Sequence, residues 1–484
     1  MKPEMFSITN LSIISLLITF QLLPIFHHIY VLGDGEVTTV TAHDGLTTET
    51  QPDGLTAGTQ LDGLTTGTQP DGLTAVTEQG AGTDESMRLL PLIHEHSPSE
   101  KDCDAAITDP AVATELTSKP YTVDSDKADA NISNSCEDIK QRGLYPENPA
   151  SDDEKDFPIV FIRVVYRAYH IQELLFNLMY APQNLYCYAL DSKSSPLFHE
   201  QMRNLSKCFP NVILTENEYE VDGAGHNMTK SYMKCLETVS EKPAWKYAIL
   251  LQNDDFPIKS NYELVKILDI LNGSNAINVG RPYRHRVPQH IDWSYAGLNL
   301  FKDSSKNVPD SRLKLAKGSP SVALSRGFVE YVTNELNLTT LINIFDSKPF
   351  GTDEMIFQSL HSDDALDAPG GFTRKCLDEQ SDFTTRYVSW SWSNRTCKSG
   401  NYRHSACVFG VADLNHLENI QHLFANKMLS ENDYGAIACW AMRFSKRIAS
   451  KSTVDFESYK QSQITSDIRP LKNKAISILS KKSG

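Results

Sequence analysis

The stretch that begins at Phe157 reads FPIVFIRVV, an apolar, β-branched run that is typical of a strand buried on both faces of a sheet. Apolar residues at positions 171, 174, 175 and 178 then recur with the period of a helix that buries one face. Further apolar runs predict strands at 185–190 (LYCYAL), 211–214 (NVIL) and 245–251 (WKYAILL), with helices around 197–207 and 230–238. This alternation predicts an α/β fold with a mostly parallel central sheet and helices on both of its faces.

Acidic residues follow two of these predicted strands. Asp191 comes directly after the second strand, and Asp254 and Asp255 come shortly after the fourth. Ligands of open parallel sheets bind beyond the carboxyl ends of the strands, so these carboxylates are candidates to face a ligand; a plain loop carboxylate or helix cap is the alternative. The chain has neither a GxGxxG loop nor a GxxxxGK[ST] loop, which argues against dehydrogenases and P-loop enzymes.

The charge of the chain is unevenly distributed. The formal net charge is −15, and residues 1–155 alone carry −18, with 8 Lys/Arg against 26 Asp/Glu. The rest is therefore slightly basic, which suits an anionic small molecule, and no Lys/Arg run suggests a nucleic-acid partner.

The N-terminus predicts a membrane anchor. From Phe6 to Leu32 the chain has no Asp, Glu, Lys or Arg, and about 20 apolar residues suffice to span a bilayer. A cleaved signal peptide is the alternative, but no A-x-A cleavage pattern follows. We therefore expect a cytoplasmic tail at 1–5 and a single signal-anchor helix at 6–32, with the rest of the chain in a lumen.

The composition of residues 33–130 predicts a low-complexity stem, followed by a folded domain at 131–484. The motif Asp-Gly-Leu-Thr begins at residues 44, 53, 62 and 71, a period of nine, and Tyr121 is the only aromatic residue in the stem. A segment with so few large apolar groups does not offset its ordering entropy, so we expect a disordered, Thr-rich stalk.

The nine cysteines are widely spaced and include no C-x-x-C pair. In an oxidising compartment they indicate disulfides with one cysteine left over, whereas a zinc site would need closely paired ligands. The six N-x-[ST] sequons that follow the predicted anchor also favour the secretory lumen, as predicted N-glycosylation sites. They are headed by Asn131, Asn204, Asn227, Asn272, Asn337 and Asn394.

Several stretches, in order along the chain, resemble the core-2/I-branching β-1,6-N-acetylglucosaminyltransferases, glycosyltransferase family 14. The most specific motifs are DFPIKSN, within 245–268, and HLFANK, within 422–428. The other stretches are 181–191 (APQNLYCYALD), 317–332 (KGSPSVALSRGFVEYV), 350–360 (FGTDEMIFQSL) and 407–414 (CVFGVADL). Together the resemblance covers about residues 130–445.

The resemblance implies a GT-A-like nucleotide-sugar-binding fold and an inverting transfer of GlcNAc from UDP-GlcNAc to the 6-hydroxyl of a sugar on an O-glycan. It also implies a type II single-pass protein of the Golgi membrane. No cofactor or divalent metal is expected, because basic side chains neutralise the diphosphate in this family. Asp254-Asp255 aligns with the acid before Phe-Pro rather than with a metal motif. Two alternatives stay open: another donor sugar, as in glucosyl- or xylosyltransferases, or a non-catalytic glycan-binding relative.

Glu354 matches the family's catalytic base, although the proline of the family's Pro-Asp-Glu motif is missing from Gly351-Thr352-Asp353-Glu354. We expect Thr352 or Asp353 to cap the following helix, which would place Glu354 in its first turn near the positive end of the dipole. Asp353 is the second candidate for the base.

On the donor side, Lys427 matches the family's phosphate-binding lysine, and Arg403 or His404 occupies the place of its second cation. Asp191 matches a nucleotide-contacting acid, with Val164 or Val165 beside the uracil. The basic loop 281–286 (RPYRHR) is a further candidate to meet acceptor or donor phosphates.

On the acceptor side, Trp390 and Trp392 match two aromatic residues, and their i, i+2 spacing places both on one face of an extended segment. The resemblance also implies the disulfide framework, with Cys376 left free. The pairs are Cys103–Cys439, Cys136–Cys208, Cys187–Cys235 and Cys397–Cys407.

Overall fold

The computed structural model describes residues 97–377, 384–451 and 454–460. The expected anchor at 6–32, most of the stem and the side chain of Cys376 lie outside these residues. Within the part that is described, no helix is both long and apolar enough to cross a membrane.

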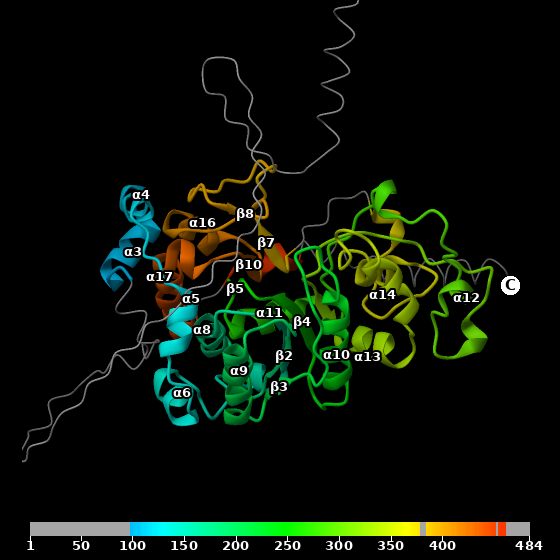
Figure 1. Ribbon diagram of the computed structural model, residues 1–484, viewed down its shortest axis with the longest axis horizontal. Coiled ribbons are helices and arrows are strands. Elements are labelled where there is room, and N and C mark those ends of the chain that lie inside the picture. Colours follow the sequence, from blue (N-terminus) through cyan, green and yellow to red (C-terminus); the bar gives the residue numbers. More distant parts are fainter. Residues whose placement is uncertain (1–96, 378–383, 452–453, 461–484) are drawn as a thin grey trace, which may run out of the picture. The chain divides into compact units, whose positions relative to one another are not determined.

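A five-stranded sheet forms the centre of the fold, with strand order β3-β2-β1-β4-β6 (Figure 1). The first four strands in the chain run parallel, and β6 pairs antiparallel with β4, so the predicted mostly parallel α/β sheet is confirmed. The strands are β1 (Ile159–Val165), β2 (Leu185–Leu190), β3 (Val212–Leu214), β4 (Tyr247–Gln252) and β6 (Ala323–Ser325).

Helices cover both faces of this sheet, and the side chains of β1 point alternately into the two cores that these helices form. Ile162 and Val164 pack with helices α10 (Met228–Ser240) and α13 (Arg326–Asn334). Phe161 and Val165 face the opposite core. That core includes side chains of α8 (Tyr169–Met179), α9 (Pro196–Cys208) and α11 (Asn261–Leu271).

A second, three-stranded sheet has the order β5-β10-β7. β10 (Phe424–Asn426) pairs antiparallel with β5 (Asp255–Pro257) and parallel with β7 (Arg386–Val388). The pair β8 (Tyr402–Arg403) and β9 (Ala406–Cys407) is antiparallel. Because β5 follows β4 after only two residues, this small sheet continues from the carboxyl end of the main one.

The remaining elements connect and cover these sheets. They are α3 (Glu100–Thr108), α4 (Pro110–Ser118), α5 (Ser125–Asn131), α6 (Cys136–Arg142), α7 (Asp152–Asp156), α12 (Tyr295–Leu298), α14 (Thr339–Asp346), α15 (Ile356–Ser362), α16 (Leu414–Asn419), α17 (Ser430–Ala449) and the short 3₁₀ turns 284–286, 304–306, 374–376 and 411–413.

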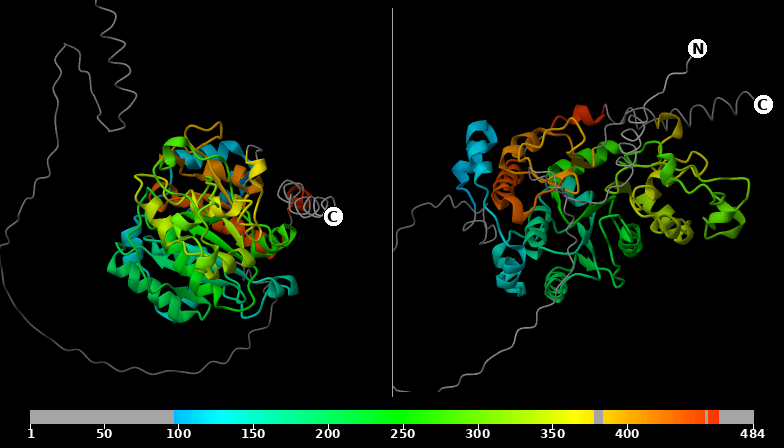
Figure 2. Two further views of the ribbon diagram at one scale, coloured as in Figure 1. Left: turned by 90° about the vertical axis from the view of Figure 1, so that its right-hand side faces the viewer. Right: turned by 45° about the horizontal axis from the view of Figure 1, so that its top comes forward.

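The packed domain begins before residue 131, the boundary expected from the sequence. Helices α3 and α4 lie beside the C-terminal segment that includes α16 and α17, as both views of Figure 2 show. Cys103 and Ile107 of α3 are buried, and the disulfide Cys103–Cys439 joins α3 to α17. Small side chains and a disulfide therefore hold a segment that the scarcity of aromatic residues had assigned to the stem.

All four expected disulfides are present. They are Cys103–Cys439, Cys136–Cys208, Cys187–Cys235 and Cys397–Cys407.

Candidate active site

The carboxyl end of β1 leads into the loop that carries Arg167. Val164 and Val165, the last residues of β1, are 4% and 0% exposed and belong to opposite cores. Asp191, just after β2, is also buried, and its Oδ1 accepts a hydrogen bond from the backbone N–H of Lys193 at 2.9 Å. The strand ends that were expected to face a nucleotide therefore lie side by side, since β1 and β2 are paired neighbours.

Three cations gather beyond this edge, and two of them, Arg167 and Arg403, pair with carboxylates. Glu431 Oε1 accepts from Nη1 of Arg167 at 2.8 Å and from Nη1 of Arg403 at 3.0 Å. Nη2 of Arg167 also lies 3.9 Å from Oδ1 of Asp254. Burial lowers the pKa of Lys427; the charge of Asp254 opposes this effect, and that of Arg403 adds to it. Two arginines, a lysine and two carboxylates thus form one cluster with a net positive charge.

His404 lies next to this cluster and is a weak candidate for its second cation. Burial lowers the pKa of His404, and the charges of Lys427 and Arg403 lower it further. An unperturbed histidine is half-charged near pH 6.5, so this one is mostly neutral at that pH. Arg403 is the residue of the two that keeps its charge.

Asp255 has a structural role that occupies both of its oxygens. It is fully buried and accepts hydrogen bonds from the backbone N–H of Gln252 at 2.7 Å and from Nδ2 of Asn426 at 2.9 Å. Arg386 lies 3.4 Å from Oδ1. Among the described residues, no group of three or more His, Cys, Asp or Glu side chains is placed to hold a metal ion. Metal independence stays a prediction. Arg167 and Lys427, the charged neighbours of Asp254, support it, because cations disfavour a metal ion there.

Glu354 lies in the loop before α15, not in its first turn. The helix begins at Ile356, its N-cap position is Met355, and no side chain caps it, so the expected capping by Thr352 or Asp353 is wrong. The physical reason is that the backbone N–H groups of Gly351 and Thr352 are bound to Ala224 O, which holds the chain in a loop. Lys317 and Arg286, rather than a helix dipole, supply the positive charge beside Glu354, at 3.0 and 3.3 Å from Oε2.

Asp353 is buried, whereas the Glu354 side chain is 24% exposed. Burial raises the pKa of Asp353 to about 7, and the charge of Glu354 raises it as well. A Cβ on Gly225, whose φ is +93°, would lie 2.3 Å from Oδ1 of Asp353, so the carboxyl is packed directly against the backbone. Asp353 is therefore a poorer candidate for a base that must reach a substrate.

The loop 222–226 joins the two groups of residues. A Cβ on Gly223 would lie 3.8 Å from Cε1 of His404, while Gly225 contacts Asp353. The loop 222–226 thus lies against His404, beside the cationic cluster, and against Asp353, next to Glu354. It links Arg403 and His404 to Glu354, which lies far from them in the sequence.

Trp390 and Trp392 stack on each other, with ring centroids 5.0 Å apart and an interplanar angle of 9°. They therefore lie on the same side of their segment, as the i, i+2 spacing predicts. Trp392 is 71% exposed and presents a free aromatic surface. The segment lies beside His404, because the backbone N–H of Ser391 donates to Ser405 O at 2.9 Å.

Sequence reasoning missed four residues of this site. Arg167 follows the first strand by two positions, and that place at a carboxyl edge was a usable signal. Glu431 and Lys317 carried no such signal, since their partners lie far away in the sequence. Arg286 was noted only as part of a basic loop with phosphates as partners, and the structure places it on Glu354 instead.

Comparisons with known proteins agree with the geometry. A family model described as Core-2/I-Branching enzyme matches residues 159–418. A β-1,3-galactosyl-O-glycosyl-glycoprotein β-1,6-N-acetylglucosaminyltransferase 4 of Danio rerio is 31% identical over 325 residues, which are 64% of this chain and 75% of that protein. The corresponding transferase 3 of Homo sapiens is 29% identical over 326 residues, 64% and 73% of the two chains. An N-acetyllactosaminide β-1,6-N-acetylglucosaminyl-transferase of Mus musculus is 29% identical over 335 residues, 66% and 80% of the two chains.

Proposed function

Because the chain belongs to the Core-2/I-branching enzyme family of β-1,6-N-acetylglucosaminyltransferases, we propose that it transfers GlcNAc from UDP-GlcNAc to the 6-hydroxyl of a sugar on an O-glycan, with inversion at C1. The names of the fish and human relatives specify a β-1,3-galactosyl-O-glycosyl-glycoprotein, and the proposal takes this class as the acceptor. The observation that carries it is that one loop, 222–226, lies against both His404, beside the cationic cluster, and Asp353, next to the Glu354 carboxylate.

Glu354 is the proposed catalytic base. The acceptor hydroxyl must lose its proton as its oxygen attacks C1 of the donor sugar, and a carboxylate within hydrogen-bond reach accepts that proton. Glu354 is partly exposed, and its Oε2 is held by Lys317 and Arg286, so the carboxylate is oriented before substrate binds. Asp353 supports the same loop from the buried side.

Lys427 and Arg403 are the proposed cations for the leaving diphosphate, and Arg167 is a third. The bond from C1 to the diphosphate oxygen breaks in the same step, so negative charge develops on UDP, and fixed cations stabilise that charge. Glu431 prevents the two arginines from repelling each other while the site is empty, since both guanidinium groups pair with its Oε1. Asp191, with Val164 or Val165, is proposed to receive the nucleotide at the adjacent strand ends.

The exposed face of Trp392 is the proposed platform for an acceptor pyranose, with Trp390 supporting it from behind. Aromatic faces match the apolar C–H face of a sugar, and the hydroxyl rim is left for polar groups. The proposed location is the Golgi lumen, with the chain held as a type II single-pass protein by residues 6–32. The four disulfides support an oxidising compartment.

The test offers the purified full chain UDP-GlcNAc, UDP-glucose and UDP-xylose with a panel of O-glycan acceptors, with and without EDTA. We expect a product heavier by one GlcNAc, with a β-1,6 linkage by NMR, at the same rate in EDTA. Transfer of glucose or xylose would change the donor assignment. Activity that disappears in EDTA and returns with Mn²⁺ would make Asp254 and Asp255 the site to reconsider. UDP binding without transfer to any acceptor would indicate a non-catalytic relative.

A further inference from the structure

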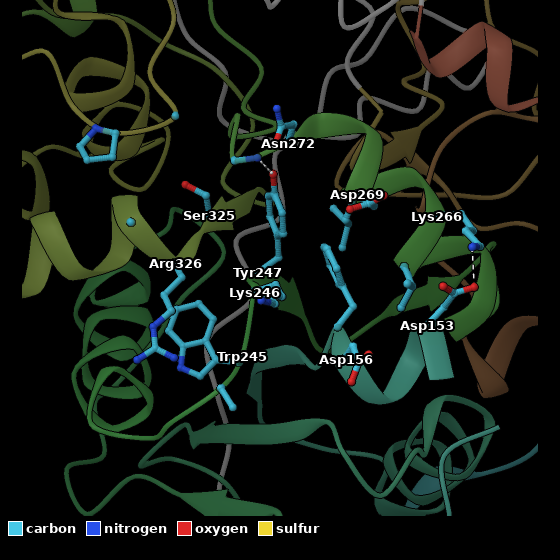
Figure 3. Close-up of a pocket in the computed structure, with 18 of the residues that line it drawn as sticks. Asp153, Asp156, Trp245, Lys246, Tyr247, Lys266, Asp269, Asn272, Ser325 and Arg326 are labelled. Atoms are coloured by element: carbon cyan, nitrogen blue, oxygen red, sulfur yellow. Dashed lines mark hydrogen bonds and ion pairs between the residues drawn. The ribbon is translucent and has the colours of Figure 1, made fainter. Parts of the chain in front are cut away.

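A pocket of about 760 Å³ lies at the edge of the main sheet opposite to the candidate active site (Figure 3). Its lining includes Phe157 and Tyr247, which precede β1 and begin β4, so it lies at the amino ends of these parallel strands. The cationic cluster and Glu354 are not among the lining residues. The pocket is therefore separate from the proposed site of the donor nucleotide.

One lining residue heads an N-glycosylation sequon, Asn272-Gly273-Ser274. Asn272 ends helix α11 in a left-handed conformation, with φ of 44°, and its side chain is exposed. Figure 3 shows it at the edge of the lining, beyond the hydroxyl end of Tyr247. Within the part of the chain that the structure describes, no hydrogen bond involves the Asn272 side chain, so its amide nitrogen is available for attachment.

The backbone of the sequon is fixed to the wall of the pocket. The backbone N–H of Gly273 donates to the hydroxyl of Tyr247 at 2.9 Å, and that hydroxyl donates to Ser274 O at 3.0 Å. A group attached to Asn272 therefore starts from a defined point on the rim.

We infer that an N-linked glycan on Asn272 folds back along the protein and that its first N-acetylglucosamine residues occupy this pocket. The inference rests on the proposed lumenal location, because N-glycans are added there. It makes the glycan a structural part of the fold, at a site separate from the transferase reaction.

The chemistry of the lining matches a sugar. N-Acetylglucosamine has an apolar C–H face and a rim of hydroxyl and amide groups. Phe157 is partly exposed and supplies aromatic surface, and it stacks on the buried ring of Tyr247, with centroids 6.0 Å apart. Asp269, Lys266 and Arg326 supply acceptors and donors for the rim. The volume is in the usual range for small-molecule pockets, about 300–1,000 Å³.

The other sequons provide matched controls. Asn394 is exposed, as Asn272 is, but it lies in the loop before Cys397 and is not a lining residue of the pocket. Asn204 and Asn227 are half-buried, and their amide nitrogens donate hydrogen bonds to Asn134 and to Glu220 O, both at 2.8 Å. Asn394 is therefore the chosen control: it is exposed, as Asn272 is, and lies outside the pocket.

The first experiment uses the full chain from eukaryotic cells under native conditions. Glycopeptide mass spectrometry gives the occupancy of each sequon, and a timed endoglycosidase digestion follows how fast each glycan is removed. We expect the Asn272 glycan to be removed at least about tenfold more slowly than the Asn394 glycan, as a site that opens only by local unfolding would be. Equal rates would overturn the inference, and so would an unmodified Asn272 beside an occupied Asn394. If no sequon is occupied, the lumenal location falls as well.

The second experiment measures the apparent melting temperature of sequon variants. Ser274→Ala removes the sequon but keeps Asn272, Ser274→Thr retains it, and Thr396→Ala removes the Asn394 sequon. Only Ser274→Ala is expected to lower the melting temperature, by about 2–4 °C, a shift of the size that a single stabilising interaction gives. Asp269→Arg, which fills the pocket, should speed removal of the Asn272 glycan to the Asn394 rate. An unchanged rate in Asp269→Arg would place the glycan outside the pocket and overturn the inference.

Discussion

The Nζ atom of Lys317 lies 3.0 Å from Oε2 of Glu354, and Nη1 of Arg286 lies 3.3 Å from the same oxygen. Each cation is itself held over an aromatic ring, Lys317 over Tyr283 at 5.7 Å and Arg286 over Phe350 at 4.9 Å. Within the described residues, Oε1 of Glu354 has no ion pair or hydrogen bond. One carboxylate oxygen is thus fixed by cations, and the other is left to accept a proton.

Glu354→Gln tests the proposed base. Glutamine keeps the shape of the side chain but cannot take the proton, so turnover should fall about 100-fold or more while UDP affinity stays nearly unchanged. The measurements are steady-state kinetics and UDP titration. Asp353→Asn is the matched control, since it also removes one carboxylate from the loop, and it should retain most of the turnover. A large loss in Asp353→Asn with little loss in Glu354→Gln would exchange the two roles.

Lys317→Met tests whether the orientation of Glu354 matters. Methionine keeps the apolar stem but removes the charge that holds Oε2, so we expect kcat to fall about tenfold, with a smaller change in the KM for UDP-GlcNAc. Lys317→Arg restores a cation at this position and should recover much of the lost kcat. If Lys317→Met weakens UDP-GlcNAc binding instead and leaves kcat intact, Lys317 acts on the donor and does not position the base.

The sequence predicted the four parallel strands β1 to β4 because each is a contiguous apolar run, but it did not predict the short antiparallel strand β6. Lys427 and Arg403 were singled out through the family resemblance, and their roles stay predictions. The position of Glu354 relative to α15 was wrong because the start of that helix depends on hydrogen bonds to Ala224, a contact distant in sequence.

The missed residues share that cause. Arg286, in the segment after α11, and Lys317, in the segment before β6, pair with Glu354 only because these segments meet the loop before α15. Helices α3 to α5 were assigned to the stem because the segment has few aromatic residues, although the resemblance already implied the disulfide that joins α3 to α17. Local sequence patterns thus predicted strands β1 to β4 and helices α8 to α10, whereas contacts between residues far apart in the sequence determine which cations lie beside Glu354.

Lys427→Ala, Arg403→Ala and His404→Ala test the donor side. Removing either full cation should weaken UDP binding as well as turnover, because the diphosphate is already charged in the ground state. Burial and the neighbouring cations lower the pKa of His404, so His404→Ala should change UDP affinity by no more than about twofold at pH 6.5–7.5. Isothermal titration with UDP gives the comparison. A strong effect in His404→Ala that grows below pH 6.5, together with a weak effect in Arg403→Ala, would assign the second cation to His404.

Non-reducing peptide mapping tests the cysteine that the four disulfides leave over. Cys376 should be the only cysteine that an alkylating reagent labels in the unfolded, unreduced chain, because the other eight are paired. The matched control is the same mapping after reduction, in which all nine cysteines are labelled. A linked peptide that contains Cys376, within one chain or between two chains, would contradict this pairing.

Asp353→Asn also gives a pH-dependent stability effect, whose sign follows from burial. Burial, and then the charge of Glu354, raise the pKa of Asp353 to about 7 in the folded protein, whereas an unfolded Asp titrates near ~3.9. Between these values the folded chain holds a proton that the unfolded chain has lost, so the free energy of unfolding falls as pH rises from about 4 to 7. Above that window, burying the ionised carboxylate lowers the free energy of unfolding by its full amount, at most ~4 kcal/mol for a pKa shift of this size.

Asparagine at position 353 removes the charge and keeps the shape of the side chain. The variant should therefore match the wild type near pH 4.5 and melt at a higher temperature near pH 8, as measured by circular dichroism at both pH values. A melting-temperature difference that is the same at both values would show that Asp353 does not titrate in this window.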